Sequence, residues 1–357
     1  MNCLLSMNTK MGSSLLLKYV IATLLVVTLW CSVQFWTADE PRPAPGRSFD
    51  SRDVEMEDFT HRWMEERGFP ELEINETLQN KDKNDGVDKP TCDDNKSPND
   101  RFVIFNVLPK SGSRTLYSLA LNVGKRHGVD VQNTMALTNE TKSEKIGRLL
   151  EDHSAATFVY SHLHYVDFNS TERNVVYISI VRDPIERLVS LYYYKRYGDS
   201  TEPGLFREKM DRLNLSRDTF DECVKRNGDC INSNLLEKTI SHFCGIDSEK
   251  SSATGKYCAT EAKRNVRNKY LVVGVMEDYD GFIKVLERLL PDVFQGATDF
   301  YNTFKTQHYF QIMKTKNKTG PSERVARELR KRMAKEYEFY EYVKREFELL
   351  KNKLGID

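Results

Sequence analysis

Residues 109–115 have the sequence PKSGSRT, which brings a lysine, three hydroxyl side chains, a glycine and an arginine together directly after an apolar run. Backbone N–H groups at a helix N-terminus bind anions, and Lys110 adds a mobile positive charge. The order differs from a Walker A loop, in which the lysine comes near the end, so a magnesium–nucleoside triphosphate enzyme is disfavoured. The segment predicts an anion-binding loop, and a simple helix-capping turn is the alternative.

A second candidate anion site follows another apolar run. Arg182 comes at the end of that run, and Ser190 lies two helical turns beyond Asp183, which with Pro184 predicts the start of a helix. A guanidinium and a hydroxyl suit a phosphate separate from the first one. A capped helix with an Asp183–Arg187 ion pair is the structural alternative. Two anion sites on one sheet predict a nucleotide that carries phosphate at both ends.

The elements that must position these residues are predicted from apolar patterns. Buried strands are expected at residues 102–107, 175–181 and 270–275. An amphipathic helix follows the first strand and ends near Gly128, and apolar residues at helical spacing between 325 and 350 predict one long helix. Strands that alternate with helices predict an α/β fold with a mostly parallel sheet, flanked by helices, over residues 100–357.

Composition excludes several classes. The chain has 357 residues, with 53 Lys and Arg against 53 Asp and Glu, so its formal net charge is zero. A general nucleic-acid partner is therefore not expected, because phosphate binding usually requires a basic excess. A hydrophobic content of 39% excludes a wholly disordered chain. No metal is required by the chemistry that the site residues predict.

Residues 19–38 are twenty consecutive uncharged residues, enough to cross a bilayer core as a helix. Lysines precede this run and acids follow it, so residues 1–18 are expected in the cytosol and the rest on the lumenal side. A cleaved signal peptide is the alternative. A short span suits a Golgi membrane, which predicts a single-pass type II Golgi protein. Residues 39–99, rich in charge and turn residues, are a predicted lumenal stem.

Cysteines and glycosylation motifs agree with a lumenal chain. Two disulfides are expected among the clustered cysteines, most simply Cys223–Cys230 and Cys244–Cys258, with a zinc site as the competing interpretation. Cys92 is left over in the stem. Six N-glycosylation motifs lie beyond the predicted span, at Asn75, Asn95, Asn139, Asn169, Asn214 and Asn317.

Several ordered blocks resemble a known family. PKSGSRT, SHLHYVDF and VRDPIERLVSLYYYKRYGD, followed by FDECV, FCG, VVGVMED and EYEFYEYVKREF, look like the Golgi uronyl 2-O-sulfotransferases. This group includes the heparan sulfate 2-O-sulfotransferase, the insect Pipe proteins and, with more similarity to this chain, the uronyl 2-sulfotransferase of chondroitin and dermatan sulfate. The resemblance runs from about residue 102 to residue 355.

The resemblance implies a P-loop-like sulfotransferase fold and 3′-phosphoadenosine 5′-phosphosulfate (PAPS) as the sulfuryl donor. Residues 314–319 are implied near the nucleotide. The positions that match the donor site are Lys110, Ser111, Gly112, Ser113, Arg114 and Thr115 for the 5′-phosphosulfate, and Arg182 and Ser190 for the 3′-phosphate.

The catalytic residues implied are His162, which matches the family's catalytic base, and Lys110. Lys110 would stabilise charge on the bridging oxygen as the sulfonate leaves. His162 would take the proton of a uronic acid 2-hydroxyl. His164 agrees with the His-X-His form of the uronyl enzymes, and three roles stay open for it: to orient His162, to contact the acceptor carboxylate, or only to pack.

The acceptor implied is a glycosaminoglycan polyanion, with chondroitin or dermatan sulfate favoured and heparan sulfate as the alternative. Lys195-Arg196, Lys263-Arg264-Arg267 and residues 324–332 are candidate basic clusters, and solvated helix faces are the other interpretation. Val107 stands where the family usually has an arginine. That difference leaves a Pipe-like enzyme with another acceptor, or a non-catalytic glycan-binding protein, as alternatives. The resemblance also implies self-association.

Overall fold

The computed structural model describes residues 100–356 except 136, 138, 153, 169–172, 201–209, 211–214, 237 and 246–255. The predicted cytosolic tail, membrane span and stem lie outside the described residues, as do Cys92 and the motif asparagines Asn75, Asn95, Asn169 and Asn214. Within the part that the structure describes, no helix is both long enough and apolar enough to cross a membrane.

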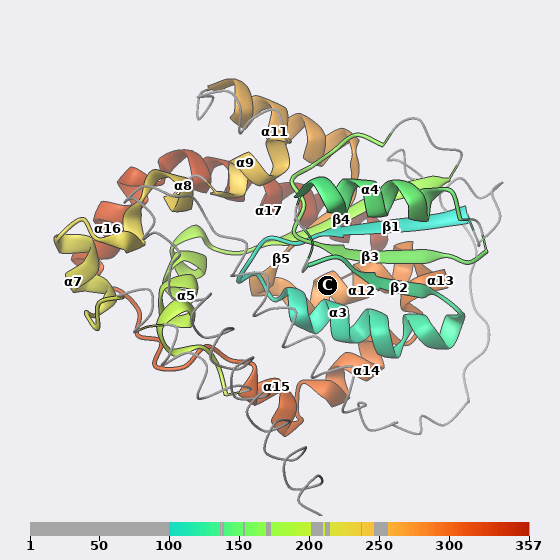
Figure 1. The fold of residues 1–357 in the computed structure, drawn as a ribbon, viewed down its shortest axis with the longest axis horizontal. Coiled ribbons are helices and arrows are strands. Elements are labelled where there is room, and N and C mark those ends of the chain that lie inside the picture. The colour runs from blue at the N-terminus through green and yellow to red at the C-terminus, as the bar shows by residue number, and fades with distance from the viewer. Residues whose placement is uncertain are drawn as a thin grey trace, which may run out of the picture. The chain divides into compact units, whose positions relative to one another are not determined.

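Five parallel strands form the central sheet (Figure 1). They are β1 (Arg101–Asn106), β2 (Asp130–Asn133), β3 (Thr157–Ser161), β4 (Asn174–Val181) and β5 (Tyr270–Val275), in the order β2-β3-β1-β4-β5. Strands β1, β4 and β5 are almost wholly buried, which explains why their apolar runs identified them. The sequence analysis did not predict β2 and β3. Strand β2 is a short, half-buried edge strand of mixed polarity, DVQN, so it carries no apolar run.

Helices cover both faces of the sheet. The helices that the structure describes are α3 (Ser113–Asn122), α4 (Asn139–Leu150), α5 (Pro184–Tyr197), α7 (Phe220–Lys225), α8 (Ser233–Leu236), α9 (Lys238–Cys244), α11 (Lys256–Asn268), α12 (Tyr279–Leu289), α13 (Pro291–Phe294), α14 (Ala297–Phe304), α15 (His308–Ile312), α16 (Glu323–Arg332) and α17 (Ala334–Leu354), with short 3₁₀ turns η2 (Gly124–His127), η3 (Asp229–Ile231) and η4 (Met276–Asp278). Figure 1 shows α3, α12 and α14 on one face of the sheet and α4 and α11 on the other.

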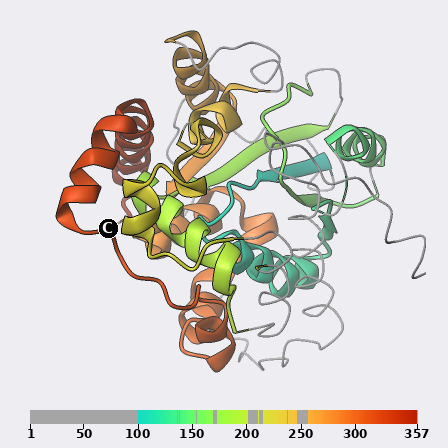
Figure 2. The ribbon, with the colours of Figure 1, turned by 60° about the vertical axis from the view of Figure 1, so that its left-hand side comes forward.

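The long C-terminal helix predicted from the apolar stripe is in fact two helices, α16 and α17, which meet at Met333. Figure 2 shows them at the red end of the chain. The stripe serves two separate cores: Val325, Leu329 and Met333 pack with α5 and α7, whereas the apolar residues of α17 from Phe339 onward pack in the core that includes the sheet. A straight helix could not face both cores, so the chain turns between them.

Strand β1 lies at the centre of the sheet, and the chain leaves it toward β2 and β3 on one side and toward β4 and β5 on the other. In open parallel sheets, ligands bind outside the carboxyl ends of the strands where the order reverses in this way. The carboxyl ends of β3, β1 and β4 are neighbours here, so the segments that follow these strands meet at one place.

Both predicted cysteine pairs are close in space. The Cα atoms are 6.3 Å apart for Cys223 and Cys230 and 5.4 Å apart for Cys244 and Cys258, which lies within the range of disulfides. The first pair joins α7 to η3, and the second joins the end of α9 to α11. The structure therefore supports the simplest pairing expected from the sequence.

Candidate functional site

The loop between β1 and α3 has an unusual backbone. Lys110 has a φ of 68° and Gly112 a φ of 82°, both in the left-handed region, and Gly112 is the N-cap of α3. A Cβ atom at Gly112 would lie only 2.9 Å from Cε2 of Tyr279, the first residue of α12. The Tyr279 hydroxyl also donates a hydrogen bond to the Gly112 carbonyl at 3.0 Å. Glycine is needed here both for the backbone conformation and for the close approach of the ring.

The hydroxyl side chains of this loop are buried at the start of α3. Ser113 Oγ accepts a hydrogen bond of 3.1 Å from the Tyr160 hydroxyl. Ser111 is fully buried, and its Oγ has no hydrogen-bond partner among the described residues. An unsatisfied buried hydroxyl is costly unless a ligand completes it. This hydroxyl, next to the N-terminus of a ten-residue helix, fits the phosphosulfate end of a PAPS molecule.

The two cations of the loop are held differently. The Lys110 ammonium lies 3.5 Å from the centre of the Tyr194 ring on α5, a cation–π arrangement. The Arg114 guanidinium makes a 2.7 Å ion pair with Asp199 and donates to the Met313 carbonyl at 2.8 Å. Arg114 therefore ties the loop to the segments after α5 and α15, in addition to any contact with a ligand.

The second predicted anion site adjoins the first. Arg182 follows β4, and its Nη1 donates to the Lys110 carbonyl at 3.2 Å, while its Nη2 lies 3.2 Å from Glu186 Oε2. Lys318 also contacts Glu186, at 2.5 Å. Burial acts to raise the pKa of the Glu186 carboxyl, but the Lys318 and Arg182 cations outweigh it and hold that pKa below its usual value. A carboxylate shared by two cations leaves one net positive charge here.

Helix α5 starts as the sequence predicts, with Asp183 as N-cap accepting the Glu186 N–H at 2.9 Å and Pro184 in the first turn. Ser190 lies one to two turns further on, 3% exposed, with its hydroxyl 3.3 Å from that of Thr315. Thr315 belongs to residues 314–319, so this segment does lie beside the predicted phosphate site. Arg187 forms no pair with the Asp183 side chain in the structure but is buried and donates to the Leu235 carbonyl.

The two candidate acceptor-side histidines follow β3. Burial alternates along residues 161–166, so His162 and His164 share the more open side of an extended segment while Leu163 and Tyr165 are buried. Lys142 of α4 donates to the His162 carbonyl at 3.1 Å. Nε2 of His164 is 3.1 Å from the Lys238 ammonium at the start of α9. Burial first, and then the Lys238 and Lys142 cations, lower the pKa of His164 to about 3, so its imidazole is neutral.

A third histidine that the sequence analysis did not single out lies beneath this pair. His242 of α9 is buried, its ring centre is 5.7 Å from that of His164, and its Nε2 is 3.3 Å from the carbonyl oxygen of Asn106 at the end of β1. Burial lowers its pKa well below the usual value. His242 lies 136 residues from Asn106 in the chain, and no spacing pattern indicated the contact.

The structure therefore brings the predicted residues together: Lys110 after β1, His162 after β3 and Arg182 after β4 lie at neighbouring strand ends. It adds residues that the sequence analysis did not indicate, namely Tyr194, Tyr279, Lys142, Lys238 and His242.

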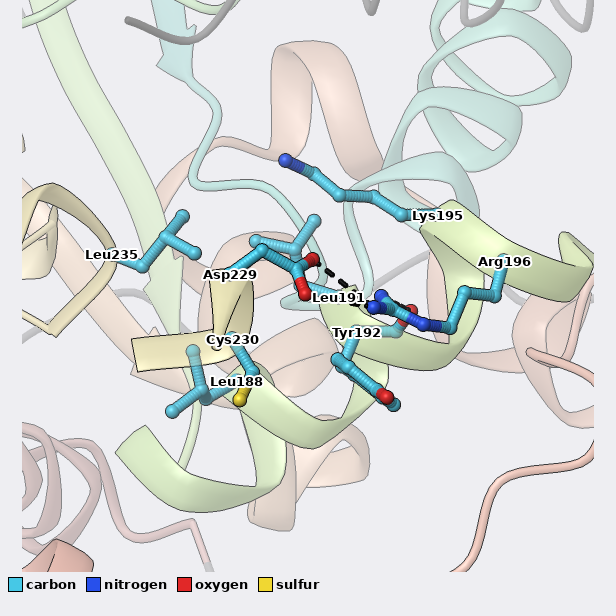
Figure 3. A pocket seen from close by; sticks show the side chains of 8 residues that line it. All are labelled: Leu188, Leu191, Tyr192, Lys195, Arg196, Asp229, Cys230 and Leu235. Carbon is cyan, nitrogen blue, oxygen red and sulfur yellow. Dashed lines mark hydrogen bonds and ion pairs between the residues drawn. The ribbon is translucent and has the colours of Figure 1, made fainter. Parts of the chain in front are cut away.

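Several residues of the predicted basic clusters make contacts with acidic side chains of this chain. Arg196 is 1% exposed, and Figure 3 shows its side chain directed at the Asp229 carboxylate, with distances of 2.8 and 3.1 Å. It also stacks 3.6 Å from the Tyr192 ring centre, so its role is structural. Lys263, Arg264 and Arg267 of α11 each pair with a glutamate.

Comparison with known proteins shows the class of enzyme to which this chain belongs. Residues 97–343 match the sulfotransferase family. Heparan sulfate 2-O-sulfotransferase 1 of Mus musculus is 33% identical over 264 residues, covering 71% of this chain and 72% of that protein. The Xenopus laevis enzyme of the same name is 31% identical over 298 residues, covering 80% of this chain and 81% of that protein.

Uronyl 2-sulfotransferase of Mus musculus is 32% identical over 263 residues, covering 71% of this chain and 64% of that protein. The chain therefore belongs to the sulfotransferase family, in the group of the heparan sulfate 2-O- and uronyl 2-sulfotransferases, and is a PAPS-dependent transferase. A mouse sulfotransferase solved with PAP, SULT7A1, has 16% identity and a TM-score of 0.32 over 55% of this chain and 59% of that chain, too low a similarity to support an inference.

Proposed function

We propose that this enzyme transfers the sulfuryl group of PAPS to the 2-hydroxyl of a uronic acid residue in a glycosaminoglycan. The observation that carries the proposal is the meeting of Lys110, His162 and Arg182 at the carboxyl ends of three adjacent parallel strands. In-line transfer between two oxygens needs a donor site and an acceptor base on opposite sides of the moving group, and positioning supplies most of the rate.

The donor side is formed by the loop after β1 and by α5. Ser111 Oγ, the backbone N–H groups at the start of α3 and the neighbouring Ser113 and Thr115 would hold the phosphosulfate end. Arg182 and Ser190, with Thr315 beside them, would hold the 3′-phosphate. When the bond between sulfur and the bridging phosphate oxygen breaks, Lys110 would stabilise the negative charge that develops on that oxygen.

The acceptor side is formed by the segment after β3. His162 would remove the proton of the uronic acid 2-hydroxyl as that oxygen forms its bond to sulfur, so the products are a sulfate ester, PAP and a protonated His162. Lys142 fixes the backbone of His162 through its carbonyl, which helps to hold the ring in place. No step in this scheme requires a metal ion.

We favour chondroitin or dermatan sulfate as the acceptor, and heparan sulfate remains the alternative. The sequence identities of 33% and 32% to the two kinds of relative do not separate them. Val107 is fully buried in the core, so this position cannot supply a cation to any acceptor. That observation supports the second candidate, a Pipe-like enzyme with another glycan acceptor, which the same assay tests.

We also propose that the chain is a single-pass type II Golgi membrane glycoprotein that self-associates. The uncharged run at residues 19–38 and the two cysteine pairs support this location. Asn317 is exposed and accessible to a glycan. We expect glycosidase treatment to lower the mass of the protein and carbonate extraction to leave it in the membrane. In sealed microsomes the C-terminal region should be protected from protease, and its digestion would exclude the topology.

The test is sulfation by the purified full-length enzyme with radiolabelled PAPS, on desulfated dermatan, chondroitin and heparan chains in parallel. Disaccharide analysis should place label on the 2-position of uronate, in dermatan or chondroitin, and His162→Ala should abolish it. Label on heparan would assign the chain to the other branch. PAP binding without labelling of any chain would favour the Pipe-like enzyme. Absence of PAP binding would exclude the transferase and leave a glycan-binding protein.

A further inference from the structure

The backbone between the two acceptor-side histidines is held by the central strand of the sheet. Asn106, the last residue of β1, donates through its side-chain Nδ2 to the Leu163 carbonyl at 3.2 Å. The two residues are 0% and 1% exposed, and a hydrogen bond is stronger in such a buried site than in water. Because Leu163 lies between His162 and His164, this bond restricts the backbone that carries both rings.

Two other hydrogen bonds of this segment lead to helices. Lys142 of α4 donates to the His162 carbonyl at 3.1 Å, and the Tyr165 N–H donates to the carbonyl of His242 in α9 at 3.0 Å. Neither helix carries a residue of the predicted donor site. The strand that ends in Asn106 leads directly into that site.

The chain between Asn106 and the donor loop is short and packed. Residues 107–109 separate Asn106 from Lys110, and all three of them are buried. The Val107 N–H donates to the Ser161 carbonyl at 2.8 Å, which continues the pairing of β1 with β3. A close-packed interior has little free volume and transmits displacements. A shift of the Asn106 side chain relative to β1 would therefore change the distance between the histidine segment and the donor loop.

Asn106 is itself fixed by two neighbours. Its carbonyl oxygen accepts a hydrogen bond of 2.7 Å from the Ser179 hydroxyl of β4 and lies 3.3 Å from Nε2 of His242. A carbonyl oxygen only accepts, so Nε2 is the nitrogen of His242 that carries the hydrogen. Ser179 and His242 are both buried. A residue held in this way by buried partners is suited to position another group.

The distance across the moving group decides the rate of an in-line transfer. In the proposed function His162 acts on the attacking oxygen and Lys110 on the leaving oxygen of the same exchange. A misplacement of about 1 Å in such an arrangement can lower the rate by about 100-fold.

We infer that Asn106 is a positioning residue of the sulfuryl transfer, which holds the segment of His162 to the strand that carries the donor loop. This inference rests on the proposed function. Because Asn106 is fully buried, it acts through its hydrogen bond to the Leu163 carbonyl and not through contact with the donor or the acceptor.

The experiment compares full-length wild type, Asn106→Ala and Asn106→Asp, with PAPS as donor and desulfated dermatan as acceptor, or desulfated heparan if the wild type prefers it. Loss of the amide donor in Asn106→Ala should lower kcat by about 10- to 100-fold. The acceptor KM and the affinity for PAP should change less than about threefold, because the binding groups remain in place. Intact PAP affinity also shows that the variants fold.

Asn122→Asp is the matched control. The Asn122 side chain donates to the Ser118 carbonyl at 2.8 Å within α3, so the substitution removes the same kind of hydrogen bond away from the strand ends. It should leave kcat within about twofold of wild type. A kcat of Asn106→Ala within about threefold of wild type, or a PAP affinity that falls in parallel with kcat, would overturn the inference.

Asn106→Asp gives a readout that a purely structural role would not change. A protonated carboxyl can donate to the Leu163 carbonyl as the amide does, whereas an ionised carboxylate cannot. Burial raises the pKa of a carboxyl, so the kcat of Asn106→Asp relative to wild type should rise by at least about fivefold between about pH 8 and about pH 5.5. Asn106→Ala should show no such rise. A ratio that does not depend on pH in Asn106→Asp would overturn the inference.

The groups around this hydrogen bond do not produce that rise. The titratable and charged side chains are His162, His164, Lys142, Lys238, His242 and Tyr270. Burial lowers the pKa of His164 to about 3 and that of His242 well below its usual value, and it raises the pKa of Tyr270. His162 and the two lysines are present in every variant, so their effects cancel in the ratio to wild type.

Hydrogen exchange separates this inference from the proposed function. If the wild type sulfates no uronate, the proposed function fails, but the link from β1 to the histidine segment is still measurable. The amides of residues 163–166 should exchange at least about fivefold faster in Asn106→Ala than in wild type, because the segment loses an anchor, whereas those of α4 should not change. Equal exchange of residues 163–166 in the two proteins would overturn the inference.

Discussion

At the scale of single residues, Lys110 shows how the backbone and an aromatic ring position a charged side chain at a strand end. Its left-handed backbone conformation turns the side chain toward α5, where the ammonium lies over the Tyr194 ring. An aromatic face attracts a cation through its quadrupole, so the Tyr194 ring restricts the position of the Lys110 ammonium.

We predict that Lys110→Met lowers kcat by about 100- to 1,000-fold, because the developing charge on the leaving oxygen loses its partner. Tyr194→Phe, which keeps the ring face, should leave kcat within about threefold. Single-turnover rates at saturating PAPS measure both. A small effect of Lys110→Met would mean that another group stabilises the leaving oxygen.

The lowered pKa of His164 should make the stability of the fold depend on pH. Its pKa is lowered to about 3 in the folded protein, whereas an unfolded histidine titrates near about 6.5. Between these pH values the unfolded chain binds one more proton than the folded protein. The stability that neutral His164 contributes is therefore fully present above about pH 6.5 and is lost toward pH 3, at about 1.4 kcal/mol per pH unit.

We therefore expect the free energy of unfolding in urea to fall when the pH is lowered from 7.5 to 5.5. The fall should be about 1 kcal/mol smaller in His164→Phe than in wild type. His242, whose pKa is lowered first by burial and then by His164, is present in both proteins, so a His164→Phe, His242→Phe double variant separates the two contributions. An identical loss in the two proteins would show that His164 takes up its proton without opposing the fold.

At the scale of elements, the loop after β1 is shaped by its contact with the start of α12. Gly112 and Gly296 have nearly the same backbone φ, 82° and 84°, but only Gly112 has an atom within 4 Å of the position of an added Cβ. Alanine substitutions at the two positions therefore distinguish the cost of backbone strain from the cost of a steric contact.

We predict that Gly112→Ala and Gly296→Ala each cost about 1 kcal/mol of stability from the positive φ. Only Gly112→Ala should also weaken PAP binding, by at least about tenfold, because the Tyr279 ring must move and with it the loop carbonyl that its hydroxyl holds. Calorimetric titration with PAP and urea unfolding give the two quantities. Unchanged PAP affinity would show that the loop adapts without Tyr279.

At the scale of the whole molecule, a buried charge pair holds the core around α5 and α7 to the core around the sheet. Glu336 of α17 caps the start of α9 and interacts electrostatically with Arg187 of α5, without a direct hydrogen bond between them, and both side chains are almost completely buried. Removing one partner of a buried pair leaves the other charge uncompensated.

We expect Glu336→Gln to destabilise the protein by about 3–5 kcal/mol, and the double variant Arg187→Met with Glu336→Gln by clearly less than the sum of the single changes. Urea unfolding of the four proteins completes the cycle. Additive losses would indicate that Glu336 acts only through its contacts with α9.

Much of the positioning framework could be predicted from the sequence. Strands β1, β4 and β5 are continuous apolar runs because both faces of a parallel sheet are covered, and the start of α5 is encoded by Asp183 and Pro184 within four residues. The loop at residues 109–115 could be predicted because helix capping and anion binding depend on residues that are neighbours in the chain.

Other features depend on contacts that only the tertiary structure creates. The edge strand β2 has no apolar pattern, and the stripe from 325 to 350 divides into two helices because it serves two cores. Lys238 lies 74 residues from His164 in the chain, and Arg196 lies 33 residues from the Asp229 that buries it. The sequence by itself determined the buried apolar strands and the helix cap, because these depend on residues that are neighbours in the chain. The tertiary structure decided which charged side chains are buried and what they contact, because their partners lie far away in the sequence.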